Sequence, residues 1–459
     1  MGIRGPGGRG GQRLHHLLVL GTPPRGPRTG VAVVQAPGER RLAGLRTGVQ
    51  HRACSVAGPL EPHRKNRHVD RGAITADRGA NPLAGLYVHI PFCSHACPYC
   101  DFSFELLKGG RVDELLAALD TEAERRGRES PWTDGVFETV FLGGGTPTCL
   151  TDRQLDRVFR TIHERFRVAP HAEITVEANP ETVTIPKLKR LRGLGVDRIS
   201  IGVQSFSRDI LLKLGRRHTA DRAEKAFASA REAGFRNVNL DLMFGVPGQS
   251  AADWADTLER AVALDPEHLS VYGLTIEPGT EYARLAEQGA LDLPDEGRHT
   301  DLYFQALDRL SDAGFRQYEI SNLAKPGFAC RHNVSCWKGG DYLGLGPSAH
   351  TRMDGRRLAN ARGLADYLHA MDERGEATDM DETLSVDERI HEYILLSLRS
   401  VDGLDTRVFR DRYGDDAMDE RDPAIHALSG EGFLAKRGSR LCLTRKGLAL
   451  ADSVCEYFM

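Results

Sequence analysis

Six short apolar runs, spread over residues 86–276, constrain the fold of this chain more than any other feature. They are Leu86–Phe92, Thr139–Gly145, Glu173–Asn179, Arg198–Gln204, Asn237–Gly245 and Leu269–Ile276. The segments between them show helical spacing, as at positions 155, 158, 159, 162 and 166, which share one helix face. Strands that alternate with helices predict a parallel sheet with crossover helices. Because six units are fewer than the eight of a closed barrel, we expect an α/β fold with a partial (β/α)6 barrel.

After about residue 380 the pattern changes. Ser385–Arg399 is predicted to be a helix that begins with a capping box, in which Ser385 is the N-cap and Glu388 follows three positions later. A helix near 405–413, a strand at Leu441–Thr444 and a final helix over 445–457 follow. This order predicts a C-terminal winged-helix-like α+β module. Such modules often bind DNA, but this one has no marked basic stripe, so we expect a docking role.

Residues 1–81 are rich in Gly, Pro and Arg and lack sustained periodicity, which predicts a disordered leader. They hold 14 Lys or Arg against 4 Asp or Glu, which leaves 47 basic and 60 acidic residues in the rest of the chain. The acidic body has no basic footprint for nucleic acid. Of two interpretations of the leader, a transit-like peptide and upstream sequence from a misplaced start codon, we favour the second. No run of 18 apolar residues occurs, so we expect no transmembrane segment.

Three of the nine cysteines lie within eight residues, directly after the end of the first apolar run. Cys93, Cys97 and Cys100 form a Cys-x3-Cys-x2-Cys motif, whose thiolates can converge on one polynuclear centre. Three thiolates leave one iron of a four-iron cluster open for another ligand, as catalytic zinc sites keep an open position. On spacing alone, a zinc site with a further ligand such as His95 and unligated core thiols remain alternatives. Cysteine usage without a secretory signal favours a reducing compartment, and we expect the cytoplasm.

The segment HIPFCSHACPYCDF (His89–Phe102), taken with Tyr87 and the Gly-rich strand ends, resembles the radical S-adenosylmethionine (SAM) superfamily. In that superfamily the cysteine loop follows the first strand of a partial β/α barrel. The resemblance implies a [4Fe–4S] cluster on Cys93, Cys97 and Cys100, with SAM on the open iron through its amino and carboxylate groups. It further implies that one electron from the cluster splits SAM to a 5′-deoxyadenosyl radical, while the protein supplies placement and shielding.

Polar residues gather where the predicted strands end, which is where ligands bind in parallel sheets. LGGGTPT (Leu142–Thr148) ends the second strand, and such a Gly-rich turn lets backbone N–H groups bind a carboxylate. Glu177, Gln204 and Asp241 end the next three strands, and Arg216 follows the fourth. Charged groups in apolar strands are costly unless they are paired or bound to a ligand. The alternative to a ligand site is therefore an ion-pair network at the barrel mouth.

The sequence is also similar, over residues 86–457, to the oxygen-independent coproporphyrinogen III oxidase-like branch of the superfamily. This resemblance implies which residues contact SAM. They are Tyr87, Tyr99, Gly144, Gly145, Thr146, Glu177, Gln204, Arg216 and Asp241. These contacts define a cofactor site and not a reaction.

Two features bear on the class within this branch. Oxidases of the HemN type act in porphyrin biosynthesis, where they decarboxylate propionates of coproporphyrinogen III, and carry a further cysteine two residues after the third ligand. In this chain that residue is Phe102. CRHNVSCW (Cys330–Trp337) resembles the HNxxYW signature of haem chaperones of the HemW type, although Cys336 stands at the tyrosine position. Both features favour the chaperone class, and the oxidase is its competitor.

His332 in this signature is the candidate axial haem ligand, since imidazole suits iron and Trp337 can cover a porphyrin face. The alternatives are a histidine that caps a turn and a Cys/His metal site with Cys330 and Cys336. The resemblance implies that the chain binds haem and passes it to acceptor proteins, leaving catalytic turnover and a homodimer open. The expected domains are a leader over 1–81, the radical SAM barrel over 82–325, a haem-signature connection over 326–380 and the winged-helix-like module over 381–459.

Overall fold

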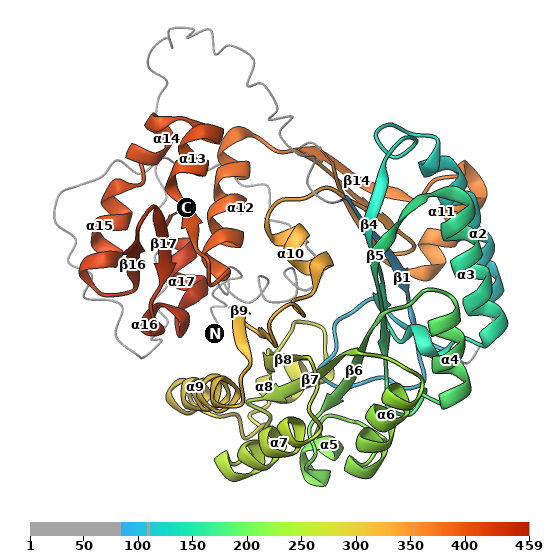
Figure 1. The fold of residues 1–459 in the computed structure, drawn as a ribbon, viewed down its shortest axis with the longest axis horizontal. Helices are drawn as coiled ribbons and strands as arrows, with labels where there is room; N and C mark the ends of the chain where they lie inside the picture. Colours follow the sequence, from blue (N-terminus) through green and yellow to red (C-terminus); the bar gives the residue numbers. More distant parts are fainter. Residues whose placement is uncertain (1–83, 108–110, 354, 459) are drawn as a thin grey trace, which may run out of the picture.

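A computed structural model describes residues 84–107, 111–353 and 355–458, so the leader expected over 1–81 lies outside the described residues. Six parallel strands lie side by side in chain order and confirm the predicted barrel units. They are β1 (Ala84–Ile90), β4 (Val136–Gly144), β5 (Arg167–Ala178), β6 (Arg198–Gln204), β7 (Asn237–Phe244) and β8 (His268–Gly273). Figure 1 shows the helices that follow these strands on the outside of the curved sheet.

Each strand is followed by a crossover helix. The longer helices are α2 (Val112–Gly127), α3 (Asp152–Arg165), α4 (Ile185–Gly193), α6 (Ala220–Glu232), α7 (Ala251–Ala263) and α9 (Glu296–Asp312). Two short helices, α5 (Arg208–Lys213) and α8 (Glu281–Glu287), precede α6 and α9. The predicted face of α3 is the buried one, and Thr151 begins the helix with a capping box that includes Gln154.

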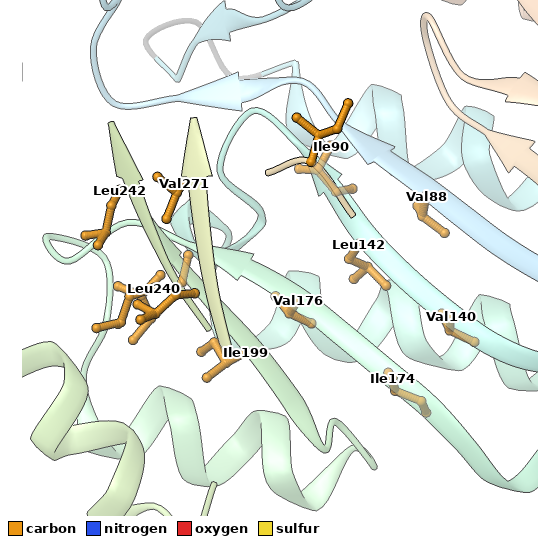
Figure 2. Close-up of a cluster of buried hydrophobic side chains, with 14 of the residues drawn as sticks. Val88, Ile90, Val140, Leu142, Ile174, Val176, Ile199, Leu240, Leu242 and Val271 are labelled. Atoms are coloured by element: carbon orange, nitrogen blue, oxygen red, sulfur yellow. The ribbon is translucent and has the colours of Figure 1, made fainter. Parts of the chain in front are cut away.

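Alternate residues of the six strands face opposite sides of the sheet. One set is apolar and packs beneath the helices, as Val88, Leu142 and Val176 do in Figure 2. The other set faces the barrel interior and is largely polar. Arg198 and His268 belong to it, with exposed fractions of 2% and 0%. The barrel thus has an apolar outer layer and a buried polar interior.

The sheet continues past both edges of the six strands, which the sequence analysis did not anticipate. Beyond β8 it adds the antiparallel strands β10 (Asn322–Ala324) and β9 (Arg316–Glu319). At the other edge β11 (Tyr342–Leu345) pairs in parallel with β1, and antiparallel strands follow it. These strands are β12 (His350–Met353), β13 (Arg356–Asn360) and β14 (Thr378–Thr383). Residues 326–380 therefore belong to the main sheet, together with α10 (Arg331–Trp337) and α11 (Leu364–Arg374).

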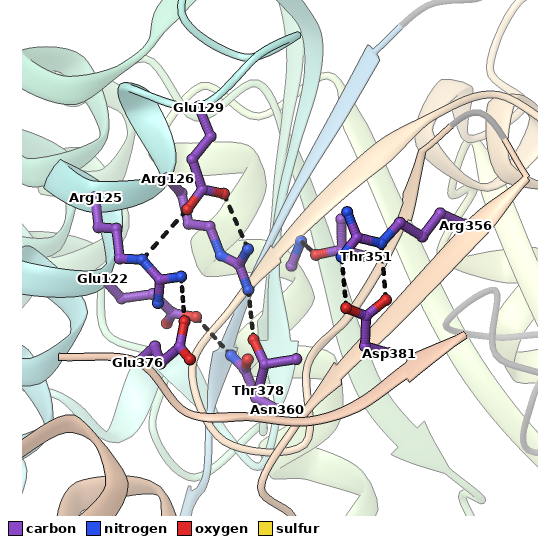
Figure 3. A network of polar contacts seen from close by, with 11 residues as sticks. Glu122, Arg125, Arg126, Glu129, Thr351, Arg356, Asn360, Glu376, Thr378 and Asp381 are labelled. Carbon is purple, nitrogen blue, oxygen red and sulfur yellow. Dashed lines mark hydrogen bonds and ion pairs between the residues drawn. The ribbon is translucent and has the colours of Figure 1, made fainter. Parts of the chain in front are cut away.

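Polar contacts fasten these added strands to α2 (Figure 3). Glu122 of α2 accepts hydrogen bonds from the Gly346 backbone N–H over 2.8 Å, the Asn360 amide over 2.6 Å and the Tyr367 hydroxyl over 2.8 Å. Its side chain is only 3% exposed. Because buried polar groups need partners, the three donors depend on this one carboxylate.

The C-terminal module contains the elements expected of a winged helix. The capping box of Ser385 and Glu388 begins α12 (Val386–Arg399), as predicted. The remaining elements are β15 (Leu404–Asp405), α13 (Thr406–Tyr413), α14 (Asp415–Asp419), α15 (Asp422–Gly430), β16 (Leu434–Arg437) and β17 (Arg440–Leu443). The strands β15, β17 and β16 form one small sheet. In Figure 1 the module lies on the side of the barrel where α10 is found.

The end of the chain corrects one prediction. A single helix over 445–457 is wrong, because α16 (Arg445–Leu448) and α17 (Ala451–Glu456) are separate. Leu450 leaves the helical conformation, with φ −130° and ψ 33°, and its N–H bonds the Gly447 carbonyl in a tight turn. No helix within the described ranges is long and apolar enough to cross a membrane.

Candidate cofactor site

A cavity of about 230 Å³ opens at the carboxyl ends of the barrel strands. Of the residues predicted for the cofactor and metal sites, all except Tyr87 and His332 line it. The cavity thus brings together side chains from β2 (Phe92–Cys93) and from the ends of β4, β5, β6 and β7. Ligands bind at this end of the strands in open α/β sheets and barrels.

The cysteine loop forms one wall of the cavity. It is fastened by the pairing of β2 with β3 (Glu105–Leu106) and by a hydrogen bond from the Cys100 N–H to the Cys97 carbonyl over 3.2 Å. The Cys93 thiol lies 3.7 Å from the Thr146 hydroxyl. Burial raises the pKa of Cys93, and it raises the pKa of Cys100 to about 12. These two thiols therefore need a cationic centre to become thiolates.

Within the described residues, no three His, Cys, Asp or Glu side chains converge on a point that would hold a single metal ion. A polynuclear cluster requires a different arrangement, because each thiolate binds its own iron. Cys93, Cys97 and Cys100 share one cavity wall, which matches that requirement.

The Gly-rich turn after β4 lies beside the cysteine loop. Gly144 has a φ of 105°, which favours glycine, and its N–H donates to a Glu177 carboxylate oxygen over 3.2 Å. A Cβ at Gly145 would lie 2.6 Å from the Phe92 carbonyl oxygen. The Thr146 N–H donates to that same oxygen over 2.7 Å. The absence of side chains here lets the turn pack directly against the strand that carries Cys93.

Two carboxyl groups, Glu177 and Asp241, line the cavity and affect each other's ionisation. Burial, together with the nearby charge of Asp241, raises the pKa of Glu177 to about 8. Burial also raises the pKa of Asp241, which accepts hydrogen bonds from Asn239 over 2.8 Å and from Ser200 over 3.1 Å. A cationic ligand would relieve the repulsion between these carboxylates and lower the Glu177 pKa.

Gln204 and Arg216 leave polar atoms without protein partners. Gln204 is 8% exposed, its Oε1 is buried without a hydrogen bond, and its φ is 66°. Left-handed conformations of non-glycine residues cost energy and cluster at functional sites. Arg216 donates to the Asn179 side-chain oxygen over 2.9 Å, but its Nε is buried and unpartnered. A ligand with polar groups would satisfy both residues.

Tyr87 does not line the cavity. Its hydroxyl lies 3.1 Å from His89 Nδ1, and its ring stacks on Phe141 with 6.2 Å between centroids. His89 Nε2 lies 2.9 Å from the Ser103 carbonyl oxygen, so it donates there and Nδ1 accepts from Tyr87. His89, oriented by Tyr87, thus connects β1 to the segment that follows the cysteines.

His332 does not line the cavity and lies closer to the start of the barrel strands. Its Nδ1 is 2.9 Å from the Thr139 hydroxyl, and its ring centroid is 5.3 Å from that of Phe141. Its backbone N–H donates to Glu173 over 3.2 Å. The side chain is 6% exposed, and burial with the nearby charge of Arg198 lowers its pKa to about 4.

Sequence reasoning missed several residues of the cavity. Asn179 donates to the Thr146 hydroxyl over 3.4 Å and accepts from Arg216, so it orients both. Phe104, Met243 and Tyr272 also line the wall. Asn179 ends the third apolar run just as Gln204 ends the fourth, and this position was the available signal.

Comparisons with known proteins agree with this geometry. Residues 87–261 match the family model of the Radical SAM superfamily, and residues 384–450 match that of the HemN C-terminal domain. The chain is 36% identical over 379 residues to the heme chaperone HemW of Bacillus subtilis (strain 168), an alignment that covers 82% of this chain and 99% of that protein. It is 35% identical over 389 residues to the heme chaperone HemW of Escherichia coli (strain K12), with 82% and 98% covered.

A solved structure shares the architecture. Coproporphyrinogen III oxidase (HemN) from Escherichia coli, a radical SAM enzyme, superposes with a TM-score of 0.73 at 26% identity, covering 82% of this chain and 90% of that chain. Membership of the radical SAM superfamily implies a [4Fe–4S] cluster and SAM. The sequence identity to the two HemW proteins extends over nearly their whole length, and it therefore narrows the family assignment within this superfamily. The chain belongs to the HemW family of the radical SAM superfamily.

Proposed function

We propose that this protein is a haem chaperone, which holds a [4Fe–4S] cluster and SAM in its barrel, binds haem and transfers it to acceptor proteins. The observation that carries the proposal is its likeness, along almost their full length, to curated proteins named heme chaperone HemW. Phe102 adds support from the site itself. It lines the cavity wall where the oxidase type would carry a further cysteine.

Cys93, Cys97 and Cys100 are the proposed cluster ligands. Their shared place on one cavity wall and the raised pKa values of Cys93 and Cys100 fit thiols that ionise only when iron binds them. When bound, the cluster supplies one electron to SAM. The Gly144–Thr146 turn and the β2–β3 pairing hold the loop against the barrel mouth.

The proposed SAM contacts follow from charge and from unpaired atoms. SAM carries a sulfonium and an amino group, which suit the carboxylates of Glu177 and Asp241. Its carboxylate suits the guanidinium of Arg216, and the buried Oε1 of Gln204 can accept from a ligand. The full set remains Tyr87, Tyr99, Gly144, Gly145, Thr146, Glu177, Gln204, Arg216 and Asp241. Tyr87 would act from behind the wall, through His89.

His332 is the proposed haem contact, but in this arrangement it does not fit a porphyrin. Its ring is buried between Thr139 and Phe141, and Nδ1 is engaged by the Thr139 hydroxyl. Coordination of haem iron by His332 would require α10 to move away from the barrel strands against which it packs. Trp337, at the end of α10, is 7% exposed and would be released by the same movement.

A second candidate is a coproporphyrinogen III oxidase, which the TM-score of 0.73 to HemN favours. The two candidates differ in turnover. Cluster-loaded protein incubated anaerobically with coproporphyrinogen III, SAM and a reductant should yield no decarboxylated porphyrin. Several turnovers per protein would overturn the chaperone proposal, and the HemN enzyme assayed in parallel shows that the conditions support the reaction.

Three further expectations belong to this proposal. A cytoplasmic location is supported by the eight described cysteines, all of which are free thiols. The match of residues 384–450 to one family model supports a C-terminal module over 381–459, after a barrel over 82–325 and the signature segment over 326–380. A homodimer stays a prediction that sedimentation can test.

A further inference from the structure

A row of hydrogen bonds runs through the barrel interior from the cavity to α10. Asn239 Nδ2 donates to Asp241 Oδ1 over 2.8 Å, and Asn239 Oδ1 lies 2.6 Å from His268 Nδ1. His268 Nε2 lies 2.6 Å from the Tyr318 hydroxyl, which accepts from the Cys330 N–H over 3.3 Å. Asp241 lines the cavity, whereas Cys330 is the N-cap of α10.

The two ends of this row determine its direction. An ionised carboxylate only accepts, and a backbone N–H only donates. Asn239 gives its amide N–H groups to Asp241 and, over 2.6 Å, to Ser200, so its oxygen accepts from His268 Nδ1–H. The Nε2 of a neutral His268 then accepts from the Tyr318 hydroxyl. Every link therefore donates toward Asp241, and the row has side branches at Asn239, which donates to Ser200 and accepts from the Ser270 hydroxyl over 3.2 Å.

Three of the five residues in the row are shielded from water. His268 and Cys330 are fully buried, and Asn239 is 2% exposed. The participants come from β7, β8, β9 and α10, so the row crosses several elements rather than one. In a low-dielectric interior an unmade hydrogen bond is costly and neighbouring bonds reinforce one another. The gain or loss of a hydrogen bond at one end of the row should therefore change the strength of the bonds at the other end.

Further contacts near Cys330 hold α10 in its position against the barrel. The Cys330 thiol lies 3.5 Å from Glu173 Oε1, which also accepts from the His332 N–H. Thr139 bonds the His332 ring. On the outside, Arg331 donates to the His171 carbonyl over 2.8 Å and to Glu138 over 3.2 Å. The row from Asp241 is thus one of several contacts that hold α10, and it leads to the cavity.

We propose that this row couples occupancy of the cavity to the seating of α10, so that a ligand on Asp241 holds α10 in the barrel and keeps His332 covered. The inference rests on the proposed function, because the ligand is SAM and the covered side chain is the proposed haem contact. A ligand shifts such an equilibrium only by its differential affinity for the two states. Asn239, His268 and Tyr318 supply that difference as positioning residues, since none of them lines the cavity.

Hydrogen exchange of peptides covering 330–338 measures the opening of α10 directly. In cluster-loaded full-length protein, saturating SAM should slow this exchange about threefold to tenfold, the effect of roughly one buried hydrogen bond. Tyr318→Phe removes the hydroxyl that joins His268 to Cys330 but keeps the ring, whose centroid lies 6.0 Å from that of Trp337. In this variant the SAM-dependent slowing should disappear, while SAM affinity by calorimetry stays within twofold.

Arg331→Ala is the matched control, because it loosens α10 from outside the row. It should speed exchange with and without SAM and retain the ratio between the two. An undiminished SAM effect in Tyr318→Phe would overturn the coupling, as would wild-type protein that binds SAM by calorimetry without any change in exchange. Absence of SAM binding in the calorimeter would instead refute the proposed function and remove the basis of the coupling with it. Should Tyr318→Phe fold poorly, Asn239→Leu interrupts the same row next to Asp241 and should give the same loss of the SAM-dependent slowing.

Discussion

The protonation state of Glu177 should set the pH dependence of SAM binding. Glu177 has a pKa of about 8 in the ligand-free cavity, raised by burial and by Asp241. A cationic ligand favours the ionised carboxylate, so affinity should rise with pH through about 8 and level off above it. At pH 6 only about 1% of Glu177 is ionised, and at pH 8 about half. If only the ionised form binds, the dissociation constant should fall about fiftyfold between these values.

Calorimetric titration of cluster-loaded protein with SAM, from pH 6 to pH 9, measures this change. The amino group of SAM titrates near 7.7–8.0 as well, so Glu177→Gln is the necessary control. The amide keeps an oxygen for the Gly144 N–H and removes the ionisation. The variant should retain only the contribution of the ligand's amine. Superimposable pH profiles for wild type and Glu177→Gln would refute the assignment of Glu177 to the cationic part of the ligand.

Three more variants test separate parts of the structure. Alanine at any one of the three motif cysteines should abolish the iron–sulfur absorption of anaerobically reconstituted protein, whereas Cys149→Ala, which removes the thiol bonded to the Phe92 carbonyl, should retain it. Glu122→Ala should lower the free energy of unfolding, measured in urea, by roughly 3–6 kcal/mol because three buried donors lose their acceptor. Glu114 is an exposed residue of the same helix, and Glu114→Ala should lower it by less than about 1 kcal/mol. Arg399→Ala should cost about 3–5 kcal/mol by the same measurement, since it leaves Glu319, 3% exposed, without its cation; a change below about 1 kcal/mol would contradict this role of the ion pair.

The barrel and most of its mouth could be predicted because both depend on local patterns. Strand runs that alternate with helical spacing give the order of the units, and the ends of those runs give the cavity. Ser385 and Glu388 show the same principle at a helix start, where two residues three positions apart determine the boundary. Gln204 was predicted as a SAM contact from its place at a strand end. Its left-handed backbone is a second, physical sign of a functional position.

The parts that escaped prediction depend on contacts distant in sequence. β11 is a four-residue run, Tyr342–Leu345, and nothing in it indicates pairing with β1. The polar interior was also not predicted, because His268 stands just before an apolar run and its partners Asn239 and Tyr318 lie on other strands. His332 could be singled out by its signature, but its burial under β1 and β4 could not, since that depends on how α10 packs.

Titration of cluster-loaded protein with haem tests the chaperone assignment most directly. A chaperone must hold its cargo at a defined site, so one haem per chain should bind saturably with a distinct Soret band. His332→Ala should shift that band and raise the dissociation constant, while cluster content and SAM affinity stay unchanged; either neighbouring thiol, Cys330 or Cys336, can replace the imidazole, so the spectrum is the more telling readout. An identical spectrum and affinity in His332→Ala would remove His332 from the haem site. Wild-type binding that never saturates, with a Soret band like that of free haem, would contradict the haem chaperone altogether.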